Sequence, residues 1–166
     1  FAAQKVGNTI YNDVVVEQLI KERASTQEIR KAINRLNSKM NTSEINPNDL
    51  VIVFISTHGF ISADGDFRLQ GDDFSSDAAD ATSVSFENDV MKVMKRMTCK
   101  KLIFMDACHS GGAFDPKNGG KGTAADVESA LAKYNEFQSG TAILASSQAN
   151  EISYEDPSWK NGAFTE

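Results

Sequence analysis

Two reactive side chains, a cysteine and a histidine, each follow an apolar segment of this sequence. Cys108 ends the mostly apolar segment 101–108 and precedes a glycine-containing turn, and His58 ends the apolar segment 51–57 in front of Gly59. A cysteine thiolate can attack a carbonyl carbon, and a nearby imidazole can act first as base and then as acid toward the leaving group. The pair, fifty residues apart with the histidine first, therefore predicts peptide-bond cleavage.

Thiol catalysis also needs hydrogen-bond donors for the oxygen that becomes negative in the tetrahedral intermediate. Gly59 has no side chain, so a substrate carbonyl could approach its backbone closely. We therefore expect the backbone N–H groups of Gly59 and Cys108 to form the oxyanion hole. Free N–H groups in the turn after Cys108 would favour its thiolate form.

Other interpretations of the same residue types stay open. Cys99 is typical of a small buried core residue, and His109 is better placed to order its loop than to reach the adjacent thiol. The two cysteines and two histidines could together bind zinc, although their spacing matches no compact ligand motif. Cys99 and Cys108 flank a predicted strand, which disfavours a disulfide between them and favours a reducing compartment.

The length and composition are typical of one ordinary globular domain. The chain has 166 residues, of which 40% are hydrophobic and 24% are charged, which is enough for a hydrophobic core. Its net charge of −6 favours basic substrates and disfavours nucleic acid and membrane surfaces, which attract clustered Lys and Arg. No apolar run reaches the roughly 20 residues of a membrane span, and no signal-peptide pattern opens the chain. We expect a soluble, cytoplasmic protein.

The segments that must position the reactive residues alternate between strands and helices. Runs of apolar and β-branched residues predict strands at residues 10–19, 51–57, 101–107 and 141–146. Capping patterns predict helices that begin after Ser25, after Ser85 and after Thr123, the second ending near Met97. The polar, aspartate-rich segment 60–83 predicts a long surface loop or a short excursion.

This alternation predicts an α/β fold with βαβ units and right-handed crossovers. The central sheet should be mainly parallel and flanked by helices on both faces. In such sheets the functional residues lie beyond the carboxyl ends of the strands. His58, Cys108 and Ser146 all fall at such ends, which is an independent reason to group them in one site.

Taken together, these motifs resemble those of the caspase-fold cysteine peptidases, and among them the metacaspase and prokaryotic orthocaspase branch. Asp106-Ala-Cys-His-Ser-Gly111 resembles the signature of that branch around its nucleophile, and Ser56-Thr-His-Gly59 resembles its Ser-Gly-His-Gly. Thr57 stands where relatives often have glycine. The similarity extends to the closing segment 146–165.

The resemblance implies a caspase-like three-layer sandwich. Residues 1–166 would form a single catalytic domain that lacks its first strand and the C-terminal small-subunit region. The remainder of its own polypeptide, or a second subunit, would then be a partner, and a protein or peptide would be the substrate.

By this resemblance Cys108 and His58 are the catalytic dyad of an endopeptidase. Alternation along the strand places Asp106 on the same face as Cys108, and a carboxylate there would select Arg or Lys. The alternative is a carboxylate that ties down a loop. Ser56 and Ser146 complete the predicted substrate-binding residues.

The dyad chemistry requires no cofactor, but some relatives bind calcium through aspartates outside the active site. Asp89 and Asp115 lie roughly where such ligands occur, with Asp72 or Asp73 a further possibility. Acidic loop residues are more often only solvated, so both interpretations stay open.

Lys117 and Lys121 lie in a glycine-rich loop after the nucleophile. An enzyme specific for Lys or Arg could cleave itself there, whereas a merely soluble loop is the alternative. Two other functions also stay open for the whole chain: a catalytically silent caspase-like scaffold, and a caspase-fold effector protease of other specificity that a sensor domain activates.

Overall fold

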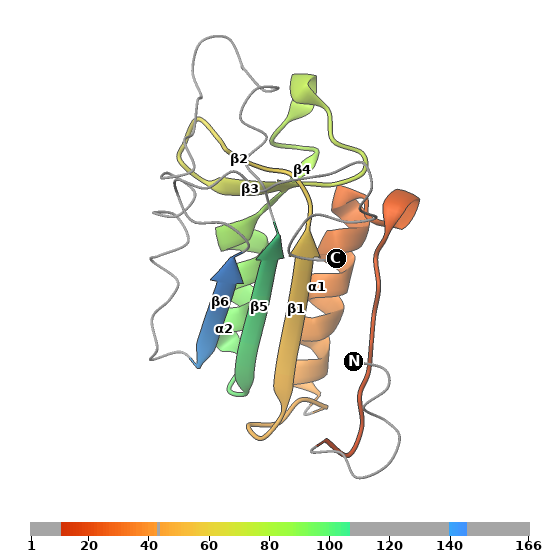
Figure 1. Cartoon of the computed structure of the whole chain (residues 1–166), viewed down its shortest axis with the longest axis vertical. Coiled ribbons are helices and arrows are strands. Elements are labelled where there is room, and N and C mark those ends of the chain that lie inside the picture. The colour runs from red at the N-terminus through yellow and green to blue at the C-terminus, as the bar shows by residue number, and fades with distance from the viewer. Residues whose placement is uncertain (1–10, 43, 107–139, 146–166) are drawn as a thin grey trace, which may run out of the picture.

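The main sheet consists of three parallel strands. The computed structural model describes residues 11–42, 44–106 and 140–145. Within them β1 (Leu50–Ser56), β5 (Lys100–Asp106) and β6 (Thr141–Ala145) pair in the order β1-β5-β6. Their carboxyl ends all point toward the top of Figure 1. The strands predicted at 51–57, 101–107 and 141–146 are therefore confirmed in their described parts, except that β1 ends one residue early, at Ser56.

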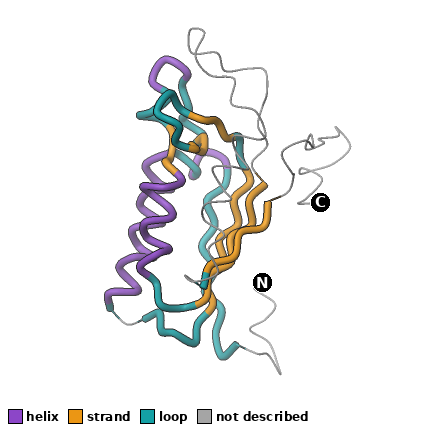
Figure 2. Tube along the Cα trace, turned by 90° about the vertical axis from the view of Figure 1, so that its left-hand side faces the viewer, coloured by secondary structure: helices purple, strands orange, loops and turns teal. Residues whose placement is uncertain are grey.

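The helix α1 (Thr26–Asn41) begins where the capping pattern predicts. The Ser25 hydroxyl accepts a hydrogen bond from the Glu28 backbone N–H at 3.4 Å, which satisfies one of the free donors of the first turn. The apolar side chains of α1 pack against the core, and they are Ile29, Ile33, Leu36 and Met40. Helix α1 therefore lies along one face of the main sheet (Figure 2).

The second predicted helix is also present, but its first part is wound more widely. Residues Phe86–Met91 form a π-helical segment (η4), and α2 (Lys92–Arg96) continues it. The Ser85 hydroxyl accepts from the Asn88 N–H at 2.9 Å, as expected of a capping residue. Helix α2 lies on the same face of the sheet as α1 (Figures 1 and 2). The helix predicted after Thr123 lies outside the described residues.

A small antiparallel sheet lies across the carboxyl ends of the main strands (Figure 1). It consists of β2 (Gly59–Ile61), β3 (Phe67–Gln70) and β4 (Ser83–Ser85), in that order. The interpretation of 60–83 as a loop was thus wrong, although the chain does make a short excursion here. A turn at Gly65, with φ of 81°, closes the first hairpin, and a short 3₁₀ helix (Ser76–Ala78) precedes β4.

The predicted strand at 10–19 is wrong for residues 11–19, which form no strand in the described structure. Three successive valines raise β propensity, but a strand also needs a partner for its backbone groups. Val15 is 71% exposed. The ion pair between Glu17 and Arg35 ties this segment to α1 instead, and a 3₁₀ turn at Lys21–Arg23 leads into the helix.

The core lies between the main sheet and the two helices. Val84, Phe86 and Ile103 are completely buried there, and the rings of Phe67 and Phe86 meet edge to face at 5.9 Å between centroids. No helix within the described ranges has the length and apolar character needed to cross a bilayer.

The opposite face of the main sheet also carries apolar side chains. The rings of Phe54 and Phe104 lie 6.1 Å apart there, and Phe54 and Leu144 are each about half exposed, at 50% and 46%. Ser56 and Asp106 follow these aromatic residues at alternate positions, so they belong to the same face.

Candidate active site

His58 lies at the junction of the two sheets. Strand β1 ends at Ser56 and β2 begins at Gly59, so His58 follows the carboxyl end of a parallel strand. The residue is exposed. It lies where the βαβ pattern places functional residues, with its imidazole accessible to solvent.

Three hydrogen bonds hold the backbone around His58. The Thr57 N–H donates to the Asp106 carbonyl at 3.1 Å, which extends the β1–β5 ladder by one residue. The Thr57 hydroxyl donates to the Gln70 carbonyl at 2.7 Å. The Gln70 N–H in turn donates to the His58 carbonyl at 2.9 Å. The loop that presents the imidazole is therefore fixed to both sheets.

Gly59 is required by a close packing contact. A Cβ atom at this position would lie 2.6 Å from Cε2 and 2.7 Å from Cζ of Phe67, well inside contact distance. The ring of Phe67 therefore occupies the space that a side chain would fill. This contact, rather than the approach of a substrate, is what the structure shows for Gly59, and its N–H in an oxyanion hole stays a prediction.

Asp106 is the last residue of β5 and is only 4% exposed. Its Oδ1 atom is buried and has no hydrogen-bond partner among the described residues. Such a carboxylate oxygen is costly to bury unless a donor or a cation reaches it. Ser56 is its register partner on β1 and is exposed, so two of the three predicted substrate-binding residues lie side by side.

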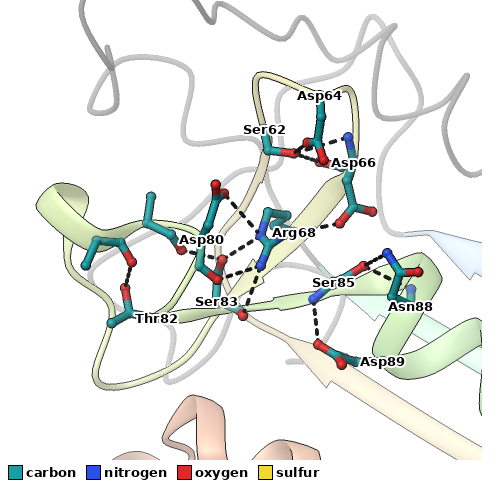
Figure 3. A network of polar contacts seen from close by, with 12 residues as sticks. Ser62, Asp64, Asp66, Arg68, Asp80, Thr82, Ser83, Ser85, Asn88 and Asp89 are labelled. Atoms are coloured by element: carbon teal, nitrogen blue, oxygen red, sulfur yellow. Dashed lines mark hydrogen bonds and ion pairs between the residues drawn. The ribbon is translucent and has the colours of Figure 1, made fainter.

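Arg68 fixes the small sheet beside this site (Figure 3). Its guanidinium donates to the Ser83 hydroxyl at 2.8 Å and to the Asp80 carbonyl at 2.6 Å, and it forms an ion pair with Asp66 at 3.4 Å. These contacts join β3, β4 and both connecting loops. The strand that carries Gln70 therefore has a rigid support.

Two of the aspartates considered for calcium, Asp89 and Asp73, are engaged with protein groups. Asp89 Oδ2 accepts from Arg30 Nε and from the Ser85 N–H, each at 3.0 Å. Asp73 Oδ1 accepts from the Thr26 N–H at 2.7 Å and from its hydroxyl at 2.9 Å. Within the described ranges, no three His, Cys, Asp or Glu side chains gather to hold a metal ion.

Cys99 is a core residue, as its apolar context indicates. It is 1% exposed, and burial raises the pKa of its thiol, which disfavours the reactive thiolate. Nearby, Lys101 donates from Nζ to the Met97 carbonyl at 2.8 Å, and burial lowers the pKa of Lys101. Both groups lie toward the amino end of β5, away from His58.

Several predicted site residues lie outside the described residues and stay predictions: Cys108, Ser146, Asp115, Lys117 and Lys121. The hydrogen bond from the Thr57 hydroxyl to the Gln70 carbonyl was not predicted from the sequence. The sequence feature that could have indicated it is Thr57 itself. Relatives often have glycine at this position, and a threonine adds a hydroxyl that can donate a hydrogen bond.

Comparison with protein families gives one clear result. The model of the caspase domain, a peptidase family, matches residues 9–166. Neither a curated protein nor a solved structure gives a significant match. The family match covers His58, Asp106 and the segment after β5, and it agrees with the parallel α/β sheet described above. The chain therefore belongs to the caspase-domain family of cysteine peptidases.

Proposed function

We propose that this protein is a cysteine endopeptidase of the metacaspase or orthocaspase type that cleaves proteins after Arg or Lys. Cys108 is the nucleophile and His58 is the base. The family match supports the peptidase activity. The exposed His58 at the end of β1, beside the strand that leads to residue 108, supports the dyad.

In the proposed reaction His58 takes the proton of the Cys108 thiol, the sulfur attacks the scissile carbonyl carbon, and the N–H groups of Gly59 and Cys108 stabilise the oxyanion. The protonated imidazole of His58 gives its proton to the leaving amine. Water, deprotonated by the same imidazole, then hydrolyses the thioester and restores the thiol.

The buried carboxylate of Asp106 carries the proposed specificity. Its Oδ1 has no partner among the described residues. Its register partner, Ser56, has a small side chain and is exposed. The guanidinium of a substrate arginine, or the ammonium of a lysine, would supply the missing donor and charge. A neutral side chain would leave the carboxylate desolvated and unpaired, which disfavours other substrates.

Activity is tested with the full chain and peptide reporters that end in Arg, Lys or Asp. Cys108→Ala and His58→Ala should each abolish cleavage of the basic reporters, while Cys99→Ala, a matched change of a buried thiol, should retain it. Unchanged cleavage by Cys108→Ala would remove the proposed mechanism. Failure of the wild-type protein to react with a thiol-directed peptide electrophile would favour the scaffold function instead.

Specificity is tested separately with Asp106→Asn, which preserves size and removes charge. The variant should lose its preference for Arg over uncharged residues by at least about ten-fold in kcat/KM, yet Cys108 should still react with iodoacetamide. Equal cleavage of basic reporters by the variant and the wild type would assign recognition to another group.

Two further proposals, self-processing and calcium binding, can be tested on the same full chain. Self-processing at Lys117 and Lys121 predicts chain fragments that disappear in a Lys117→Gln, Lys121→Gln double variant. Calcium binding predicts activity that rises on addition of calcium and falls with a chelator. Of the two predicted ligands, Asp115 would take part, whereas Asp89 is engaged with Arg30 and the Ser85 N–H instead.

A further inference from the structure

We infer that Thr57 is a positioning residue for the imidazole of His58. The inference rests on the proposed role of His58 as the base. Thr57 immediately precedes His58, and its side-chain hydroxyl donates to the Gln70 carbonyl on β3 at 2.7 Å. It contributes no group to the reaction itself, and its effect is on where the next residue lies.

Thr57 is where two separate sheets are joined. Its N–H donates to the Asp106 carbonyl at the end of β5, which belongs to the main sheet. Its hydroxyl binds the small sheet. One residue thus holds the histidine's strand against β5, which leads to the nucleophile, and also against β3.

The hydroxyl fills a gap in the backbone pairing. Pairing of β2 with β3 begins with Gly59 opposite Leu69, and the ladder of β1 with β5 ends at Ser56 opposite Asp106. Residues 57 and 58 lie between the two ladders. Among the residues that the structure describes, single backbone bonds and the Thr57 hydroxyl restrain this link, and a glycine there would leave it freer to rotate.

The acceptor of this hydrogen bond is itself well supported. Gln70 pairs with Ser83 across β3 and β4, and the Ser83 hydroxyl is bound by Arg68 at 2.8 Å (Figure 3). Gln70 also donates its N–H to the His58 carbonyl. The hydrogen bond from the Thr57 hydroxyl therefore has a well-held acceptor, so it can fix where the imidazole of the next residue lies.

The effect on catalysis follows from geometry. The base must lie within hydrogen-bond distance of the thiol, and a displacement of about 1 Å can cost on the order of 100-fold in rate. Loss of the hydrogen bond from the Thr57 hydroxyl should therefore lower kcat more than it raises KM. The backbone contacts of Asp106, including the bond from the Thr57 N–H, do not involve the hydroxyl and should persist.

The test compares Thr57→Val, which keeps the shape and removes the hydroxyl, with Thr57→Ser, which keeps the hydroxyl. Thr57→Val should lose roughly ten-fold or more in kcat, with KM nearly unchanged, and Thr57→Ser should restore most of the loss. The control is Thr82→Val. Thr82 also donates to backbone carbonyls, of Ser75 and Ala78, but ties only its own loop and should leave kcat unchanged.

A readout that depends on the imidazole separates positioning from stability. In the wild type, Cys108 should be alkylated by iodoacetamide even at low pH, because the imidazole stabilises the thiolate. In Thr57→Val this low-pH reactivity should be lost, because the imidazole is displaced. A variant that melts at a lower temperature but keeps the wild-type kcat and alkylation profile would overturn the inference.

The inference and the proposed function fail in different ways. His58→Ala that cleaves like the wild type would overturn the proposed function, and the inference with it. An inactive His58→Ala together with a fully active Thr57→Val would overturn the inference alone.

Discussion

Ser56 and Asp106 are register partners in the parallel ladder of β1 and β5, yet Ser56 is exposed while Asp106 is only 4% exposed. Because the two side chains share one face of the sheet, the serine borders the space in front of the carboxylate. A small, exposed residue beside the buried carboxylate is what the proposed recognition of a long basic side chain would need.

Ser56→Val is expected to obstruct that approach. The added methyl groups should reduce kcat/KM for arginine reporters by roughly 10- to 100-fold, mainly through KM, because the dyad is not altered. Steady-state kinetics with Arg and Lys reporters measure this. Alkylation of Cys108 by iodoacetamide is the control and should keep the wild-type rate; a variant with wild-type KM would place the basic side chain elsewhere.

Gly59→Ala should destabilise the protein by about 1–3 kcal/mol, because the new Cβ meets the ring of Phe67. Chemical denaturation measures the free energy of unfolding. In a Phe67→Leu background the same change should cost less, since the smaller side chain gives way. Equal costs in both backgrounds would show that the ring is not the obstacle.

Asp73→Asn should weaken the junction between α1 and the loop before β4. Burial raises the pKa of Asp73, but hydrogen bonds from Thr26 outweigh it and the net shift is downward from the ordinary 3.8. The stabilisation is therefore complete above pH 3.8 and is lost as the pH falls through the lower folded value. The cost near neutral pH should be about 0.5–1 kcal/mol, the lower part of the range for helix caps.

The control for this change is Asp72→Asn, since Asp72 contacts the same segment through its backbone N–H, which donates to the Ala24 carbonyl at 2.9 Å. Its side chain makes no hydrogen bond among the described residues. Urea unfolding at several pH values compares the variants. If the free energy of unfolding of Asp73→Asn fell at low pH as much as that of the wild type, the carboxylate of Asp73 would not be the group that titrates.

Asp89→Asn should lower the melting temperature to the same extent with calcium and with a chelator, because Asp89 holds Arg30 and caps the turn at Ser85. A double-mutant cycle with Arg30→Gln should give a coupling of about 0.5–1 kcal/mol for this partly exposed pair. Glu87→Gln, which alters an exposed pair with Lys95, is the control. A loss seen only with calcium would assign Asp89 to a metal site.

The main sheet could be predicted because its strands are local and strongly patterned. Residues 51–55 and 102–105 are entirely apolar, which is typical of strands in a parallel sheet, and Ser25 marks the helix start by its own side chain. The Ser56-Thr-His-Gly59 and Asp106-Ala-Cys motifs then pointed to the two strand ends that hold the candidate site.

The small sheet could have been predicted only in part. Phe67 and Leu69 alternate with polar residues, and Asp64-Gly65 is a common hairpin signal, but strands of three or four residues are short beside the surrounding aspartates. The capping of α1 by Asp73 joins residues 47 positions apart, so no local pattern reveals it. The valines at 14–16 misled because propensity does not supply a neighbouring strand.

The pairing of Leu50 with Lys100 and of Ser56 with Asp106 has a consequence for the order in which the chain folds. Contacts within 59–86 join near neighbours, whereas the β1–β5 ladder must close a loop of fifty residues, which is entropically costly and slow. Among the described strand pairs, β1 and β5 join the residues that lie farthest apart in sequence, so we expect the proposed catalytic centre to form after the local contacts of 59–86. A newly synthesised chain should therefore gain the proposed proteolytic activity only late in folding, which would protect its unfolded state from self-cleavage.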